Sequence, residues 1–364
     1  MQSIDEKISA LEEEIRKTPY HKGTEHHLGK LKARMAKLKE EKMERTFKVK
    51  SSGAGEGYAV RKTGDATVVL VGPPSVGKST LLNKLTNAES KVAAYDFTTL
   101  SVIPGMLEYK GAKIQIFDVP GVISGAALGK GRGKEVLSVA RGADLILMMV
   151  DIKTISLMPT IFKELYEAGV RFNEEKPRIS ILKQASGGIK VNATTSLKLS
   201  YDTIKSLAAE FHLTNAEIII KEDISLERLI DAFMGNRAYL SYIVVVNKID
   251  LGIPGNMNKY LAKGEDLVLV SAEDGKDLEN LKEKIWEKLN LIRVYLKKDE
   301  KIDFEKPLIV KKGVDLAWIL SSVTIPGRET FRAAKVFGPG AKYEGQEVSL
   351  AFVPEDGTVV KFLS

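Results

Sequence analysis

The sequence lacks cysteine, long apolar runs and a signal-like N-terminus. With no cysteine among 364 residues, a disulfide scaffold, a thiol nucleophile and a cysteine metal site are all excluded. The longest apolar run, Leu145 to Val150, is far shorter than the ~20 residues that a membrane-spanning helix needs. Charges follow Met1 closely, where a signal peptide would carry its apolar segment. We therefore expect a cytoplasmic protein that does not cross a membrane.

The overall composition is that of a folded protein with a basic surface. Apolar residues make up 44% of the chain and charged residues 28%, which is ordinary for globular domains. The length exceeds one ordinary domain, since domains run to about 100–200 residues. A net charge of +7 makes a polyanionic partner plausible without establishing one.

The first fifty residues predict a helical hairpin. Ser3 and Glu6 have the spacing of a capping box, and the first helix should end at Thr18-Pro19 because proline disfavours helix in its predecessor. A second helix should begin near Thr24. Its polar face is strongly basic, with Lys30, Lys32, Arg34, Lys37, Lys39, Lys42 and Arg45. Both a solvated face and a phosphate-contacting face fit this pattern, and we favour the solvated face.

Short β-branched runs alternating with helical patterns predict an α/β fold from Thr67 onward. The runs are nearly continuous in apolar residues, which is typical of parallel strands buried on both faces. Met106–Tyr109 should pair with Lys113–Phe117 as a hairpin, giving the sheet one antiparallel edge. The predicted parallel strands are Thr67–Val71, Lys113–Phe117, Leu145–Val150, Tyr242–Val246 and Leu267–Val270.

Residues 171–237 fit this alternation poorly and predict a small ββαβα insert. Ile179–Leu182 and Ile189–Asn192 flank a Gly-Gly turn as an expected hairpin, and helices are expected from about Tyr201 to Phe211 and from Leu226 to Met234. The expected domains are 1–57 (basic helical), 58–170 with 238–289 (α/β), 171–237 (insert) and 290–364. The last is a compact mixed domain ending in a strand, Thr358–Phe362.

A phosphate-binding loop follows the first strand. Gly72 to Ser79 matches G-x-x-x-x-G-K-[ST] between a strand and a helix, so backbone amides and the helix N-terminus can surround phosphates. Lys78 would reach the β- and γ-phosphates, and the Ser79 hydroxyl would bind Mg²⁺. Nucleotide contacts are expected from Gly72, Pro74, Ser75, Val76, Gly77, Lys78, Ser79 and Thr80.

Two further segments complete the expected phosphate and magnesium site. Asp118 closes a strand and can hold Mg²⁺, usually through water, while the Gly121 amide would point at the γ-phosphate. Upstream, either Thr98 or Thr99 could complete the Mg²⁺ shell and order its loop when a γ-phosphate is present.

Asn247-Lys248-Ile249-Asp250 indicates a guanine site at the same sheet edge. A carboxylate at Asp250 accepts the ring N–H and the exocyclic amine of guanine, and a buried Asp250 would stay unpaired against adenine. Asn247 would tie this segment back to the phosphate side, and Lys248 would lie along the base. Ser271-Ala272-Glu273 closes the next strand, so the Ala272 amide could donate to the guanine O6. The alternative interpretation, an ATP-dependent enzyme, holds only if Asp250 does not face the base.

These motifs resemble the Obg/DRG branch of GTPases, and most of all the developmentally regulated GTP-binding (DRG) proteins, with an archaeal member expected. The resemblance rests on the phosphate loop, residues 95–100 (Tyr-Asp-Phe-Thr-Thr-Leu), the glycine-rich run from Asp118 to Gly133, and the Asn-Lys-Ile-Asp motif. It implies a split P-loop GTPase domain, an insert resembling a ribosomal-protein domain and a C-terminal TGS domain of β-grasp type. It also implies Thr99 rather than Thr98 as the Mg²⁺ ligand.

The residues predict slow hydrolysis. Val122 stands where Ras-like GTPases carry a water-orienting glutamine, and an apolar side chain cannot position a nucleophile. The resemblance implies the same, because the Obg/DRG branch has a hydrophobic residue at this position. We expect stimulation by a partner, by K⁺ or by a rearranged loop, although Ser75 replaces the asparagine that K⁺-dependent relatives often carry. Lys130 and Arg132 could supply charge, but solvated loop charges or partner contacts are the favoured interpretation.

The expected role is a GTP-hydrolysing switch on RNA or ribosomes. The basic charge and the resemblance of the accessory domains support a role on RNA. The sequence contains no motif that reads nucleic-acid bases, so the role does not rest on one. The alternative is a GTP-gated scaffold for protein binding, because the resemblance also implies a dedicated DRG regulatory protein as partner. His21, His26, His27 and His212 lack carboxylate companions at ligand spacing, so we do not assign them a metal.

Overall fold

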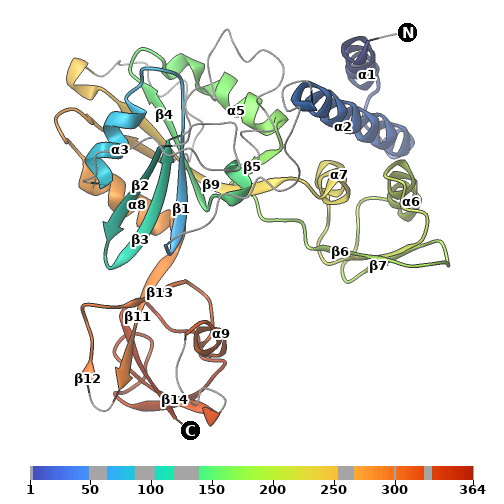
Figure 1. Ribbon diagram of the computed structural model, residues 1–364. Coiled ribbons are helices and arrows are strands. Elements are labelled where there is room, and N and C mark those ends of the chain that lie inside the picture. The colour runs from blue at the N-terminus through green and yellow to red at the C-terminus, as the bar shows by residue number, and fades with distance from the viewer. Residues whose placement is uncertain are drawn as a thin grey trace. The chain divides into compact units, whose positions relative to one another are not determined.

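The computed structural model describes residues 3–48, 64–86, 103–118, 139–252, 266–298, 301–323 and 330–363. The chain divides into two compact units (Figure 1). One holds the N-terminal helices together with Lys163–Tyr239, and the other holds the large sheet and the C-terminal sheet. No helix within these residues is both long and apolar enough to cross a lipid bilayer.

The large sheet is mostly parallel and buried, as the continuous apolar runs predict. Its strand order is β10-β9-β4-β1-β3-β2, and β5 (Val170–Phe172) also pairs with β9. The pairs from β10 to β3 are parallel, whereas β2 is antiparallel to β3 at the edge. The predicted α/β class and the antiparallel edge are therefore confirmed. The strands are β1 (Ala66–Val71), β2 (Ile103–Tyr109), β3 (Ala112–Asp118), β4 (Leu145–Asp151), β9 (Ala238–Asn247) and β10 (Leu267–Leu269).

Two helices build the core on this sheet. Leu81 and Leu85 of α3 (Lys78–Thr86) and Leu281 and Ile285 of α8 (Leu278–Leu289) belong to one buried apolar cluster with the strands. The connection after β4 carries a short 3₁₀ turn, Ile155–Leu157, and α5 (Met158–Glu167). A second 3₁₀ turn, Ile249–Leu251, follows β9 directly. The candidate polar residues therefore lie at the strand ends and in the first turn of α3.

The C-terminal residues form a second mixed sheet with the order β12-β11-β16-β14-β15, and β13 also pairs with β11. The central pair β11 and β16 is parallel and the other pairs are antiparallel. Ile319 of α9 (Leu316–Ser322) packs with the inward side chains of this sheet. The strands are β11 (Leu291–Lys298), β12 (Lys301–Ile302), β13 (Leu308–Lys311), β14 (Ala333–Phe337), β15 (Gln346–Ser349) and β16 (Thr358–Leu363). The name TGS for this part stays a prediction.

The N-terminal hairpin follows its predicted signals closely. Helix α1 (Ile4–Lys17) begins with a complete capping box, in which Ser3 and Glu6 exchange side-chain to backbone hydrogen bonds. It ends at Thr18, as the following proline predicts. Helix α2 (Glu25–Lys48) begins one residue after the predicted position.

The insert has the predicted elements but a different strand order. Strands β6 (Ile179–Lys183) and β7 (Ile189–Ala193) do not pair as the expected hairpin, because β8 (Ala216–Ile220) lies between them. The hairpin prediction was wrong: β8 is the more buried, isoleucine-rich strand and takes the central place. Strand β5 (Val170–Phe172) precedes the module. Helices α6 (Tyr201–Glu210) and α7 (Leu226–Met234) complete it.

Helix α2 is packed against this insert within one unit. Its Ala33 is fully buried in the insert's apolar cluster, and at Gly29 an added Cβ would lie 3.2 Å from Leu226 Cδ1. Glu25 is only 3% exposed and accepts hydrogen bonds from Ser200 N and Thr203 Oγ1, at the first turn of α6. The N-terminal helices and the insert thus share a core.

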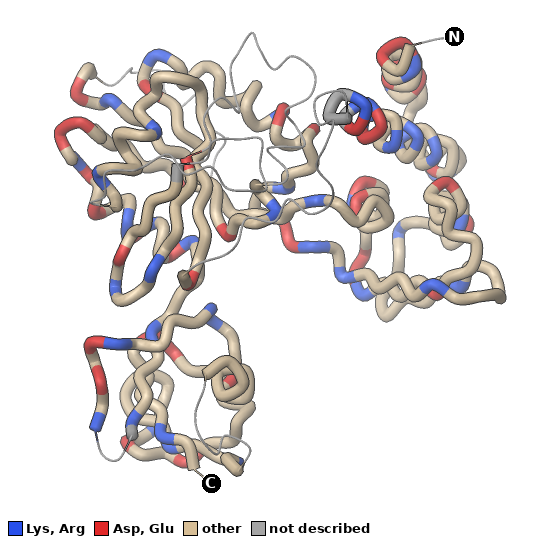
Figure 2. Tube along the Cα trace, in the orientation of Figure 1, with Lys and Arg blue, Asp and Glu red and all other residues tan. Residues whose placement is uncertain are grey.

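The basic face of α2 makes ion pairs rather than forming the favoured solvated face. Lys39 and Lys42 pair with acids of α1, whereas Lys32 and Arg34 pair with acids of the insert. Figure 2 shows the mixed charge along this helix. Because these basic side chains are already paired with nearby acids, fewer of them are available to bind phosphates. The pairs are Lys32–Glu227, Arg34–Glu210, Lys39–Glu12, Lys42–Asp5 and Arg45–Glu41.

Candidate functional site

The candidate site lies where parallel strands of the large sheet end. The carboxyl ends of β1, β4 and β9 reach one edge together, because their registers align Leu70 with Leu147 and Asp151 with Asn247. Open α/β sheets bind ligands at this edge. The polar residues predicted from the sequence therefore meet there.

The phosphate loop is fixed by two close approaches that only glycine allows. A Cβ on Gly72 would lie 2.1 Å from the Met149 carbonyl oxygen, and a Cβ on Gly77 would lie 2.3 Å from Asn247 Nδ2. Gly77 also has φ +96°, and Ser75 has φ +63°, which is uncommon for a residue with a side chain. The loop is thus packed tightly against β4 and the segment after β9.

Lys78 lies inside the loop that it follows. Lys78 is only 7% exposed. Its Nζ donates hydrogen bonds to the carbonyl oxygens of Gly72 at 3.1 Å and Pro73 at 2.8 Å. Burial lowers the pKa of Lys78, and the charge of Asp118 acts in the opposite direction. The ammonium is therefore held by the loop at the start of α3.

Ser79 and Asp118 form a pair that fits a magnesium site. Ser79 Oγ donates to Asp118 Oδ2 at 2.6 Å, and Asp118 is only 1% exposed. The other carboxylate oxygen, Oδ1, is buried and has no hydrogen-bond partner within the described part of the chain. An unsatisfied buried carboxylate oxygen is costly unless it meets a cation or donor. Hard oxygen ligands of this kind suit Mg²⁺.

Asn247 ties the segment after β9 to the phosphate loop, as predicted. Its Nδ2 donates to the Val76 carbonyl oxygen at 2.8 Å, and its Oδ1 accepts from the Ala272 amide at 2.9 Å. Asn247 is 3% exposed. The Ala272 amide was predicted to donate to the base. In the structure it instead donates to the Asn247 side chain, because β10 runs parallel to β9 and the chain continues past the end of β10 to Ala272.

Lys248 and Asp250 differ from the expected arrangement. Lys248 Nζ donates to the Ser75 carbonyl oxygen at 2.6 Å and to Asp151 Oδ2 at 2.9 Å, so it lies against the phosphate loop. Asp250 is exposed, whereas a buried carboxylate was expected there. The reason is local: Lys248 has φ +63° and the 3₁₀ turn Ile249–Leu251 begins immediately after it.

Asp151 is part of the site and was missed in the sequence. It closes β4 and is 5% exposed. Burial opposes its ionisation, but hydrogen bonds from Lys248 and Thr154 outweigh burial and lower the pKa of Asp151. The signal was available, because Asp151 follows a buried strand in the same way as Asp118 and Asn247 follow theirs.

The remaining predicted residues divide into two groups. Ser271 is fully buried and its Oγ accepts from the Asp274 amide at 3.3 Å, whereas Glu273 is exposed. Thr80 lies on α3, partly buried. Outside the described residues lie the other predicted positions, namely Thr98, Thr99, Gly121, Val122, Lys130 and Arg132.

Two family models match the chain. "50S ribosome-binding GTPase" covers residues 67–184, and "C-terminal region of MMR_HSR1 domain" covers residues 186–291. An uncharacterised GTP-binding protein of Methanocaldococcus jannaschii is 48% identical over 98% of this chain and 92% of its own length. Human developmentally-regulated GTP-binding protein 2 is 40% identical over 99% of both chains. The chain belongs to the DRG family. A DRG protein of Arabidopsis thaliana, developmentally-regulated G-protein 3, is 42% identical over 100% of this chain and 99% of its own length.

Membership in the DRG family agrees with the resemblance seen in the sequence motifs. The similarity extends over the N-terminal helices and the C-terminal sheet as well, since the relatives match nearly the whole chain. The sheet with its phosphate loop is the P-loop GTPase fold, and this DRG chain carries a GTPase domain.

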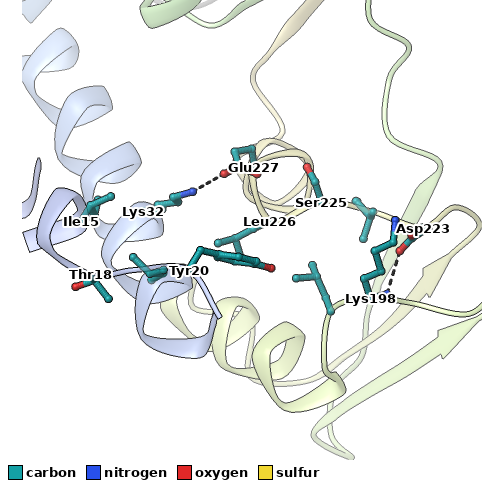
Figure 3. Close-up of a pocket in the computed structure, with 12 residues that line it drawn as sticks. Ile15, Thr18, Tyr20, Lys32, Lys198, Asp223, Ser225, Leu226 and Glu227 are labelled. Atoms are coloured by element: carbon teal, nitrogen blue, oxygen red, sulfur yellow. Dashed lines mark hydrogen bonds and ion pairs between the residues drawn. The ribbon is translucent and has the colours of Figure 1, made fainter. Parts of the chain in front are cut away.

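The N-terminal unit of this DRG protein contains a separate cavity of about 480 Å³ (Figure 3). Tyr20 lies against it, and its charged lining residues form ion pairs, Lys32 with Glu227 and Lys198 with Asp223. Among the described residues, no group of three or more histidine or acidic side chains is placed to hold a metal. The strand-end site therefore remains the candidate for chemistry.

Proposed function

We propose that this DRG protein binds GTP at the strand-end site and hydrolyses it slowly with Mg²⁺. The observation that carries the proposal is the hydrogen bond from Asn247 to the Val76 carbonyl, which joins the segment bearing Asp250 to the phosphate loop. One continuous site thereby offers a phosphate cradle and a carboxylate for a purine. The GTPase family model over residues 67–184, which include the phosphate loop, supports it.

The phosphate half of the site supplies charge and orientation. In the proposal, Lys78 exchanges its loop carbonyl contacts for the β- and γ-phosphate oxygens, and the loop amides from Ser75 to Ser79 surround the phosphates. Ser79 and Asp118 hold Mg²⁺, with Thr99 as the further ligand and the Gly121 amide toward the γ-phosphate. Bound Mg²⁺ supplies neutralisation of the charge that develops on the phosphate oxygens.

The base half sets specificity. Asp250 accepts the two donors on the guanine edge, and its exposure in the structure leaves it accessible to a base. Asn247 holds Val76 and Ala272 together, so that residues 247–250 and 271–273 form one wall. Guanine offers this carboxylate two donors and adenine offers neither at the same edge, so the site should prefer GTP to ATP.

The slow rate, the cation and the partners are also part of the proposal. Val122 cannot orient a water, so we expect stimulation by a partner protein, by K⁺ or by ribosomes or RNA. The matching family model describes a 50S ribosome-binding GTPase, which supports the ribosome as partner. The relatives' similarity over the whole chain supports a shared regulatory protein. We expect the protein to act in the cytoplasm.

The test compares hydrolysis of GTP and ATP in potassium and sodium salts, with and without ribosomes and with and without chelation of Mg²⁺. Asp250→Asn should shift preference from GTP toward xanthosine triphosphate, and unchanged GTP affinity would refute the base assignment. Lys78→Ala should abolish turnover, whereas wild-type rates would remove Lys78 from the mechanism. Equal rates in both salts would eliminate the potassium proposal.

A further inference from the structure

Strand β4 separates the two halves of the proposed site. In the sheet it lies between β1, which leads into the phosphate loop, and β9, which leads into residues 247–250. Its last residue, Asp151, is directly beside Asn247 in the parallel register. A side chain at the end of β4 is therefore placed to contact the side chains that reach across this gap from the end of β9.

The two oxygens of Asp151 have different partners. Oδ1 accepts from the Thr154 amide at 2.9 Å, the Lys153 amide at 3.1 Å and Thr154 Oγ1 at 2.8 Å. Oδ2 accepts from Lys248 Nζ at 2.9 Å. The turn after β4 thus fixes the carboxylate through one oxygen and leaves the other directed at Lys248.

Lys248 in turn contacts the phosphate loop. Its Nζ donates to the Ser75 carbonyl oxygen at 2.6 Å while it is paired with Asp151. A lysine side chain is long and flexible, and its ammonium has three donors that need fixed acceptors to hold one position. Asp151 supplies the charged acceptor, and Ser75 supplies the contact to the loop.

We propose that Asp151 is a positioning residue for guanine-nucleotide binding, which holds Lys248 against the phosphate loop so that the base and phosphate halves are preorganised together. The inference rests on the proposed function, because it concerns binding at the same site. Fixing both halves before the nucleotide arrives lowers the ordering cost of binding.

Asp151→Asn is the informative variant because an amide has a single acceptor oxygen. Three donors of the turn surround the Oδ1 position, so the amide oxygen belongs there and the amide nitrogen faces the Lys248 ammonium. The variant therefore keeps the turn and removes the acceptor for Lys248. Asp144→Asn is the matched control, since Asp144 precedes the same strand at its opposite end and accepts from the Thr67 amide.

The experiment measures the dissociation constant and dissociation rate of a fluorescent GDP analogue, and kcat and KM for GTP. The full chain is used as wild type, Asp151→Asn, Lys248→Ala, the double variant and Asp144→Asn. Losing a charged hydrogen-bond partner should weaken GDP binding by about 10-fold in Asp151→Asn, mainly through faster dissociation. In the Lys248→Ala background the same substitution should change binding less than about twofold, which a purely structural role would not produce.

The turnover number should separate positioning from catalysis. At saturating GTP, Asp151→Asn should keep kcat within about twofold of wild type while KM rises, because the contact lies outside the phosphate-transfer residues. Unchanged GDP dissociation in Asp151→Asn overturns the inference, and so does an equal loss in the Lys248→Ala background. If wild type itself binds no guanine nucleotide, the proposed function fails, which is a different result.

Discussion

Replacing Asn247 by alanine should uncouple the base and phosphate halves of the site. The side chain is 3% exposed and makes two hydrogen bonds, to the Val76 carbonyl oxygen at 2.8 Å and from the Ala272 amide at 2.9 Å. Val76 is fully buried and Ala272 is 1% exposed, so neither partner has a ready substitute. The substitution leaves one buried acceptor and one buried donor unsatisfied.

The magnitude follows from these two groups. Each unsatisfied buried group costs about 1–3 kcal/mol, and the pair about 2–4 kcal/mol, because solvent reaches the loop near the exposed Ser75. For a unit of this size the melting temperature should fall by roughly 2–4 °C per kcal/mol. GTP binding should weaken together with stability, since the variant frees the same residues that the proposed function places around the nucleotide.

The assay combines thermal unfolding by circular dichroism with calorimetric titration of GDP. Asn280→Ala is the control, because Asn280 makes a comparable contact to Asp277 at 3.1 Å on the exposed face of α8. The control should change stability by less than about 0.5 kcal/mol. If Asn247→Ala melted and bound GDP like Asn280→Ala, the hydrogen bonds of Asn247 would not join the two halves.

Three further predictions concern other parts of the chain. Glu25→Ala should destabilise the N-terminal unit by about 1–3 kcal/mol, because Ser200 N and Thr203 Oγ1 lose a buried acceptor. Amide hydrogen exchange in α2 and α6 measures this loss, and unchanged protection of these amides would contradict the prediction. Gly77→Ala should weaken GDP binding by more than about tenfold, since its Cβ would lie 2.3 Å from Asn247 Nδ2 at a φ of +96°, and wild-type calorimetry would refute this. Hydrogen bonding to Glu283 raises the pKa of Tyr109 to about 12, so its contribution to stability should be complete below pH ~10 and be lost as the pH rises to about 12. Phenolate absorbance of wild type minus Tyr109→Phe measures this pKa, and ionisation near pH ~10 would show that the hydrogen bond is absent.

Local patterns predicted the elements of the fold and most of the residues at the strand ends. The capping box at Ser3, the helix Leu226–Met234 and the polar residues Asp118 and Asn247 were all read from short segments. Each depends on interactions between neighbours in the chain, or on the rule that parallel strands end at one edge. The same rule would have identified Asp151.

Features that depend on distant pairing could not be predicted in this way. Strand β8 enters between β6 and β7 although the chain reaches it only after a helix, and no local pattern encodes that order. Most of the acids that pair with the basic face of α2 lie in α1 and in the insert, far away in sequence. The contact of Lys248 with Asp151 likewise requires two strands to be adjacent.

The shared core of α2 and the insert has a consequence for dissecting the protein. A fragment that begins after residue 48 would strip the cover from Leu207 and Leu226, beside which Gly29 and Ala33 lie, and would leave Ser200 N without its acceptor. The phenotype of such a truncation would reflect the newly exposed apolar surface of the insert, and not the role of the removed helices. Residues 3–48 and 163–239 should accordingly be deleted, exchanged or expressed as a pair.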